Sequence, residues 1–137
     1  LQKRSVLDMG CDTAVLAILA SMCGADPLLA IDVDEWAYRN ALENVRLNGI
    51  ENIDVLHGDA RLLGSQTFDV IFANINRNIL LQDIPAYAKV LNRGGKLLLS
   101  GFYREDIPAI REKCEEQGLL YHHFSEMDNW VAVVCEK

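Results

Sequence analysis

Short apolar runs alternate with longer amphipathic stretches along almost the whole chain, and this alternation constrains the fold more than any other feature. Each apolar run has the length of a strand that is buried on both faces, and most of the stretches between them are long enough for a crossover helix. A parallel sheet covered by helices produces this pattern. The sequence therefore predicts an α/β fold.

Hydrophobic periodicity and glycine positions indicate where the elements lie. Helices are expected at 13–23, at 35–48, around Leu80 to Leu91 and around Ile107 to Cys114. The last two apolar runs, 119–124 and 130–135, are separated by a polar turn that is too short for a helix, which predicts an antiparallel hairpin. We therefore expect a Rossmann-like sheet of five parallel strands with helices on both faces, followed by a C-terminal antiparallel hairpin. The parallel strands are expected at 5–9, 28–32, 53–57, 68–73 and 96–100.

Composition limits the size of the protein and its partners. The chain has 137 residues, 50% of them hydrophobic and 24% charged, so one globular domain over residues 1–137 is expected. The net charge is −7 and the basic residues are scattered, which argues against nucleic acid as a direct partner. No apolar run is long enough to cross a bilayer and no export leader is recognisable, so we expect a cytoplasmic protein without a membrane partner.

The cysteines carry no metal-binding or disulfide signature. They are not arranged as C-x-x-C and have no histidine at ligand spacing, so no metal site is expected. We expect four buried free thiols in a reducing compartment: Cys11, Cys23, Cys114 and Cys135.

Acidic and amide residues stand where the expected parallel strands end. Asp8 and Gly10 mark the first strand end, and Asp32, Asp59 and Asn74 follow the next three in order. A glycine turn before a helix suits either a dinucleotide or S-adenosylmethionine. The turn matches only the first glycine of G-x-G-x-x-G, which disfavours a dinucleotide and a nicotinamide oxidoreductase. S-adenosylmethionine is net cationic, so an acidic lining suits it better than it suits two phosphates.

Each acidic residue also has a structural interpretation. A strand-end aspartate is commonly a helix N-cap, and Asp34 with Glu35 favours a helix N-terminus. We expect structural roles of this kind for Asp69 and Asp83. The ordered set of strand-end residues, rather than any one of them, indicates the cofactor site.

The motifs at these strand ends resemble class I S-adenosylmethionine-dependent methyltransferases. The resemblance is carried by VLDMGC at 6–11, Asp32, HGDA at 57–60 and FDVIFANI at 68–75. More narrowly, ANI, the LSGF stretch at 99–102 and the late Trp130 resemble the catalytic domain of the PrmA family, whose members methylate a protein of the ribosomal large-subunit stalk base. The resemblance implies a class I methyltransferase sheet, S-adenosylmethionine as cofactor and a basic ribosomal protein as substrate.

The same resemblance implies a role for each matched residue. Asp8 and Gly10 would frame the methionine end of the cofactor, and Cys11 would give backbone contacts. Asp32 would hold the ribose hydroxyls, and Asn74 would be the catalytic residue that orients the incoming amine beside the methyl group. The adenine would be contacted by Val33, Asp59 and Ala60. Asn76 and Arg77 either take part in the site or begin the following helix.

The chain departs from the family pattern in two respects. Asp12 stands where the family has its second glycine, and its added Cβ and charge predict weaker cofactor binding. The family also has an upstream segment that covers the cofactor and a separate substrate-recruiting domain, neither of which is in these residues. We therefore expect residues 1–137 to be the C-terminal catalytic part of a longer protein.

Two other functions remain open at this stage. A methyltransferase acting on RNA or DNA bases is one, although Asn74 is not followed by the Pro-Pro-aromatic pattern of adenine methyltransferases. The other is a non-catalytic nucleoside-binding module, which the aspartate in the glycine loop keeps open.

Overall fold

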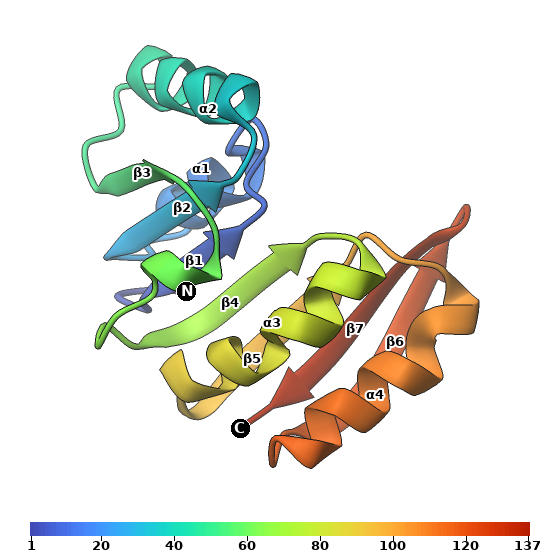
Figure 1. Cartoon of the computed structure of the whole chain (residues 1–137). Coiled ribbons are helices and arrows are strands. Elements are labelled where there is room, and N and C mark those ends of the chain that lie inside the picture. The colour runs from blue at the N-terminus through green and yellow to red at the C-terminus, as the bar shows by residue number, and fades with distance from the viewer.

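A computed structural model describes all residues from 1 to 137 and has a seven-stranded sheet in the order β3-β2-β1-β4-β5-β7-β6. The pairs among β1 to β5 are parallel, whereas β7 runs antiparallel to both β5 and β6 (Figure 1). The expected parallel sheet and terminal hairpin are therefore confirmed. The strands are β1 (Val6–Met9), β2 (Leu28–Asp32), β3 (Ile53–His57), β4 (Phe68–Asn74), β5 (Leu91–Ser100), β6 (Leu120–Met127) and β7 (Trp130–Glu136).

Helices cover both faces of the sheet, as expected. The first helices, α1 (Val15–Met22) and α2 (Glu35–Leu47), pack on one face, whereas α3 (Arg77–Val90) and α4 (Ile107–Glu116) pack on the other (Figure 1). Short 3₁₀ helices, η1 (Ala60–Leu62) and η2 (Arg104–Asp106), follow β3 and β5. No helix is both long enough and apolar enough to span a membrane.

The core is divided by the sheet because successive strand side chains point to opposite faces. Val6 belongs to the apolar cluster beneath α1 and α2, and the adjacent Leu7 belongs to the cluster beneath α3 and α4. Both side chains have no exposed surface. The continuous apolar runs of the sequence thus reflect strands that are buried on both sides.

One face of α1 exposes large apolar side chains to solvent. Its buried face is formed by small residues and Ile18, and the opposite face exposes large apolar side chains. The sequence, apolar on nearly all sides, does not distinguish these two faces. The exposed side chains are Val15, Leu16, Leu19 and Met22.

The ends of several elements differ from the predictions because long-range pairing decides them. The hairpin turn contains only Asp128 and Asn129, both with positive φ, as in a two-residue type I′ turn. The fifth strand was expected at 96–100, but β5 begins at Leu91, which pairs with Phe68, and the pairing is irregular between Leu91 and Lys96. Cys23 caps α1 and is exposed, so the expectation of four buried thiols is wrong at this position.

Candidate functional site

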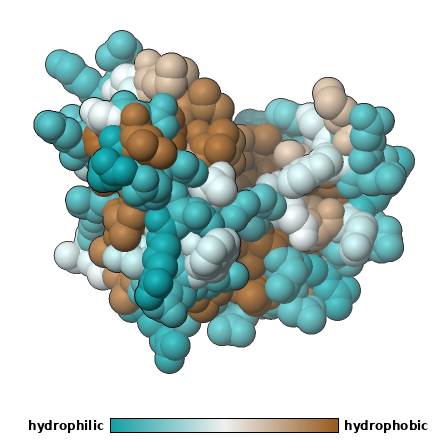
Figure 2. Space-filling view, turned by 90° about the horizontal axis from the view of Figure 1, so that it is seen from above, coloured by the Kyte–Doolittle hydropathy of each residue, from teal (hydrophilic) through white to brown (hydrophobic).

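A cavity of about 730 Å³ lies at the carboxyl ends of β1 to β4. The sheet order changes direction between β1 and β4, and crevices at such switch points are where open α/β sheets bind ligands. The volume is in the range of small-molecule and cofactor sites. Seen from above, the molecule is hollowed between the side that carries α2 and the side that carries the β6–β7 hairpin (Figure 2). The predicted site residues that line the cavity are Gly10, Asp32, Val33, Asp59, Ala60 and Asn74.

The loop after β1 has a left-handed backbone at several positions. Gly10 has a φ of +74°, and Asp12 and Ala14 follow with φ values of +50° and +65°. A Cβ atom on Gly10 would lie 2.8 Å from the carbonyl oxygen of Asn74, so only glycine lets the loop approach the end of β4 this closely. Asp12 and Ala14 adopt a conformation that favours glycine, and Asp12 also adds a carboxylate to the cavity.

The Asp32 carboxylate joins two parts of the site. The backbone N–H of Asp12 donates to its Oδ2 at 2.9 Å, and the backbone N–H of Asp34 donates to its Oδ1 at 2.9 Å. The carboxylate is therefore fixed at the end of β2, and each oxygen keeps a lone pair for a further donor. Two vicinal hydroxyls of a ribose are suitable donors.

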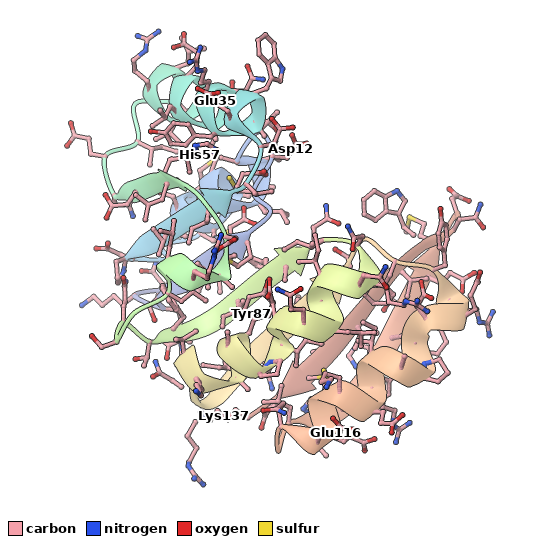
Figure 3. All side chains as sticks on the ribbon, in the orientation of Figure 1. Asp12, Glu35, His57, Tyr87, Glu116 and Lys137 are labelled. Carbon is pink, nitrogen blue, oxygen red and sulfur yellow. The ribbon has the colours of Figure 1, made fainter.

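His57 fixes the segment after β2. Its Nε2 is 2.9 Å from the carbonyl oxygen of Val33, and since a carbonyl can only accept, Nε2 carries the proton and donates. The ring stacks on Tyr38 of α2 with its centroid 5.5 Å away. Figure 3 shows His57 below α2, on the same side of the molecule as Asp12. The Val33 side chain remains 65% exposed and lines the cavity.

Asp59 is engaged by a neighbouring cation. The guanidinium of Arg61 donates to both carboxylate oxygens of Asp59 at 3.0 to 3.2 Å, and the Arg61 backbone N–H donates to Oδ1 at 2.9 Å. The Arg61 side chain lowers the pKa of the Asp59 carboxyl. The remaining lone pairs of Asp59 stay available to a donor such as an exocyclic amine.

Asp83 lines the cavity from α3, which is a role that the sequence did not indicate. It is half-buried, and burial together with the charge of Asp59 raises the pKa of its carboxyl. One turn further along α3, the Tyr87 hydroxyl is fully buried without a hydrogen-bond partner. The expected structural role holds for Asp69, which accepts from Ser5 and Asn92, but Asp83 belongs to the cavity wall.

Asp8 and Cys11 lie beneath the cavity rather than on its surface. Asp8 is 1% exposed and neither carboxylate oxygen has a hydrogen-bond partner. Burial raises the pKa of Asp8 to about 7; the dipole of the nearby Ala17 backbone N–H, which is not within hydrogen-bond geometry, opposes this rise, and the charge of Asp32 adds to it. The Cys11 thiol is buried as well, and burial raises its pKa to about 12, so it is not a nucleophile at neutral pH.

The residues after β4 divide between the cavity and the next helix. Asn74 is exposed at the end of the strand and lines the cavity. Asn76 lines the cavity too, and it is also the N-cap of α3, where its side chain accepts from the backbone N–H of Ile79. Arg77 is the first helical residue and pairs with Asp106. No cluster of side chains in the structure has the composition of a metal site.

Residues 1–137 match a family model described as ribosomal protein L11 methyltransferase (PrmA). The chain belongs to the PrmA family. It is 56% identical to the ribosomal protein L11 methyltransferase of Phocaeicola vulgatus over 134 residues, which are 97% of this chain and 48% of that protein. It is 54% identical to the corresponding Porphyromonas gingivalis protein over 129 residues, 93% of this chain and 44% of that one. The chain spans about half the length of these curated relatives.

Solved structures place the fold among methyltransferases. The ribosomal protein L11 methylase from Lactobacillus delbrueckii subsp. bulgaricus is 30% identical and superposes with a TM-score of 0.91 over 100% of this chain and 71% of that chain. A methyltransferase from Pyrococcus furiosus, 21% identical, has a TM-score of 0.83 over 98% of this chain and 75% of that one, and shows the fold alone. The Rossmann-like methyltransferase fold expected from the motifs is confirmed.

Replacing Asp12 with glycine is expected to tighten binding of S-adenosylmethionine severalfold. The change removes a Cβ from the glycine loop and removes from the cavity a carboxylate that would repel the carboxylate of the cofactor. Asp128→Gly is the matched control because Asp128 has a similar φ of +48° in the hairpin turn, away from the cavity. Titration calorimetry should show tighter binding for Asp12→Gly only. Equal or tighter binding by the Asp12 protein would contradict the prediction.

Proposed function

We propose that this chain carries out S-adenosylmethionine-dependent N-methylation of ribosomal protein L11. The observation that carries the proposal is the cavity of a PrmA-family chain, in which Asp32 at the end of β2 and Asn74 at the end of β4 face one space. The named function of its relatives supports the ribosomal protein as substrate. The proposal concerns the full-length protein, because the relatives are about twice as long as the matched residues.

The cavity residues fit the cofactor by charge and by hydrogen-bonding capacity. Asp32 offers acceptors to the ribose hydroxyls, Val33 an apolar surface to the adenine, and Asp59 an acceptor to its amino group. Gly10 lets the loop after β1 lie directly against the end of β4, which brings Asn74 next to the loop that would hold the methionine end. The uncompensated carboxylate of Asp8 lies beneath this loop and favours a nearby positive charge. When bound, the cofactor supplies a methyl group on a sulfonium.

The protein contributes mainly positioning to the transfer. With the cofactor bound, the amine nitrogen would form a bond to the methyl carbon as the carbon–sulfur bond breaks, the bonding electrons would stay on sulfur, and the product nitrogen would release its proton to water. The amine must be neutral before it attacks, and a lysine with a pKa of about 10.4 in water loses its proton more readily in a desolvated pocket. We propose that the side-chain carbonyl oxygen of Asn74 accepts a hydrogen bond from this amine and thereby aligns the amine.

A methyl-transfer assay tests the proposal. The full-length protein is incubated with methyl-labelled S-adenosylmethionine and purified ribosomal protein L11, and label is expected in the L11 band. Asn74→Ala should reduce kcat on the order of 10²-fold, because misalignment of the reacting atoms has an effect of that size. Asn48→Ala is the matched control, since Asn48 is an exposed C-cap of α2 outside the cavity.

Two results would overturn the proposal. Label in ribosomal RNA and not in L11 would indicate a nucleic-acid methyltransferase. Cofactor binding without transfer to either substrate would indicate a binding module.

A further inference from the structure

Gly101 lies directly against the residues that end β4. An ideal Cβ atom on Gly101 would lie 2.8 Å from the side-chain Oδ1 of Asn74 and 2.8 Å from both the backbone nitrogen and the carbonyl oxygen of Ile75. Cβ atoms do not approach other heavy atoms this closely, and two of these three atoms are backbone, which has little freedom to move. The absence of a side chain at 101 is therefore what allows this contact.

Neighbouring interactions hold Gly101 in this position. Ser100 pairs with Asn74 on one side and with Ala132 of β7 on the other, and the backbone N–H of Ile75 donates to the carbonyl oxygen of Ser100 at 3.0 Å. Phe102, on the other side of Gly101, is 6% exposed and belongs to the core. A side chain at 101 would therefore press on the Asn74 side chain and on the backbone of Ile75.

The end of β4 is enclosed between two glycines from different loops. Gly10 approaches the carbonyl oxygen of Asn74 from the β1 loop, and Gly101 approaches the Asn74 side chain from the end of β5. Gly10 and Asn74 line the large cavity, whereas Gly101 lines a second, smaller cavity. Asn76 lines both cavities. Gly101 thus contacts the exposed Asn74 carboxamide without itself lining the large cavity.

We propose that Gly101 is a positioning residue for methyl transfer, which acts by fixing the carboxamide of Asn74 at the end of β4. This inference rests on the proposed function, because it assumes that Asn74 aligns the amine. It also gives a physical role to the glycine of the LSGF stretch, whose other residues belong to β5 or to the core.

Gly101→Ala tests the inference against two controls with the same backbone strain. Gly101 has a φ of +94°, and Gly94 and Gly118 have φ values of +83° and +79° with no atom within 4 Å of an added Cβ. All three alanine variants should be less stable in urea unfolding because of the left-handed backbone, and Gly101→Ala should lose the most because its Cβ also meets Asn74 and Ile75. Only Gly101→Ala should reduce kcat, by at least tenfold, while the Kd for S-adenosylhomocysteine stays within threefold of the unsubstituted protein.

The double variant Gly101→Ala with Asn74→Ala separates positioning from general damage. If Gly101 acts through Asn74, Gly101→Ala should reduce kcat much less in a protein that already carries Asn74→Ala than in the unsubstituted protein. A folded Gly101→Ala protein with unchanged kcat would overturn the inference. So would a loss of kcat equal to that of Gly94→Ala and Gly118→Ala.

A measurement on the unsubstituted protein covers the case in which Gly101→Ala fails to fold. Nuclear Overhauser effects are expected between the Gly101 Hα protons and the Asn74 side-chain amide, whose two protons should show one sharp pair of signals. Missing effects, or an amide averaged among rotamers, would overturn the inference. If the unsubstituted protein binds cofactor but transfers no methyl group to L11, the proposed function fails instead, and the nuclear Overhauser effects still decide whether Gly101 fixes Asn74.

Discussion

Replacing Asp8 with asparagine is expected to stabilise the folded protein by about 4 kcal/mol at pH 8 and by much less at pH 4. The carboxyl is 1% exposed, both of its oxygens lack a hydrogen-bond partner, and burial raises its pKa from 3.8 to about 7. Well below its unfolded-state pKa of 3.8 the carboxyl is protonated in both the folded and the unfolded state, so its ionisation has no influence on stability there. Between pH 4 and 7 the unfolded state ionises first, and the folded state loses about 1.4 kcal/mol of relative stability per pH unit.

Urea unfolding of both proteins between pH 4 and 8 measures this effect. The unsubstituted protein should lose stability across this range relative to Asp8→Asn, and the difference should level off above pH 7. Asp69→Asn is a contrasting control, since hydrogen bonds from Ser5 and Asn92 lower the pKa of the Asp69 carboxyl. The ionised Asp69 carboxylate stabilises the folded protein at pH values above the pKa that this carboxyl has in the unfolded state. The contribution is lost as the pH falls, so Asp69→Asn should destabilise the protein most at neutral pH. A difference in the free energy of unfolding between Asp8→Asn and the unsubstituted protein that does not change with pH would contradict the prediction.

The strands that could be predicted from sequence are those whose limits are set by local chemistry. The limits of β2 and β3 agree with the predictions, because apolar runs end there at residues that favour turns and caps. The first turn of α2 was also predictable, since Asp34 accepts from the backbone N–H of Trp36 as an N-cap should. Such features depend on residues within a few positions of one another.

Features that depend on distant parts of the chain could not be predicted in this way. β5 begins at Leu91 only because Phe68 is there to pair with it, and no local pattern indicates that partner. Asp83 lines the cavity because α3 turns this face toward η1, which depends on how the helix packs. The contact of Gly101 with Asn74 likewise arises from the pairing of β5 with β4.

The candidate site was predictable to the extent that strand ends converge at one edge of a parallel sheet. Asp32, Asp59 and Asn74 were identified from their order along the chain, and the sheet brings all of them to one cavity. Sequence order does not indicate depth, however. Asp8 in β1 and Cys11 in the loop after it are close to Gly10 in sequence, but both are buried and lie beneath the cavity surface.

Replacing Asp32 with alanine is expected to weaken binding of S-adenosylhomocysteine by about 10² to 10⁴-fold. The substitution removes a carboxylate that would accept two hydrogen bonds from the ribose, and a hydrogen bond to a charged group contributes about 1.5–3 kcal/mol. It also leaves the backbone N–H groups of Asp12 and Asp34 without their acceptor. Asp32→Asn keeps one carbonyl acceptor and should lose less affinity. Asp54→Ala, at an exposed position of β3 outside the cavity, should bind as the unsubstituted protein does.

The choice of ligand separates the ribose contact from collapse of the loop. A 2′,3′-dideoxy analogue of S-adenosylhomocysteine offers no hydroxyl to Asp32, so titration calorimetry should show similar, weak binding to the unsubstituted protein and to Asp32→Ala. If Asp32 acted only by holding the backbone of Asp12 and Asp34, Asp32→Ala would weaken the binding of S-adenosylhomocysteine and of its dideoxy analogue by the same factor. Binding of S-adenosylhomocysteine by Asp32→Ala within threefold of the unsubstituted protein would rule out the ribose contact, since a fixed carboxylate with free lone pairs at this position would then contribute nothing to affinity.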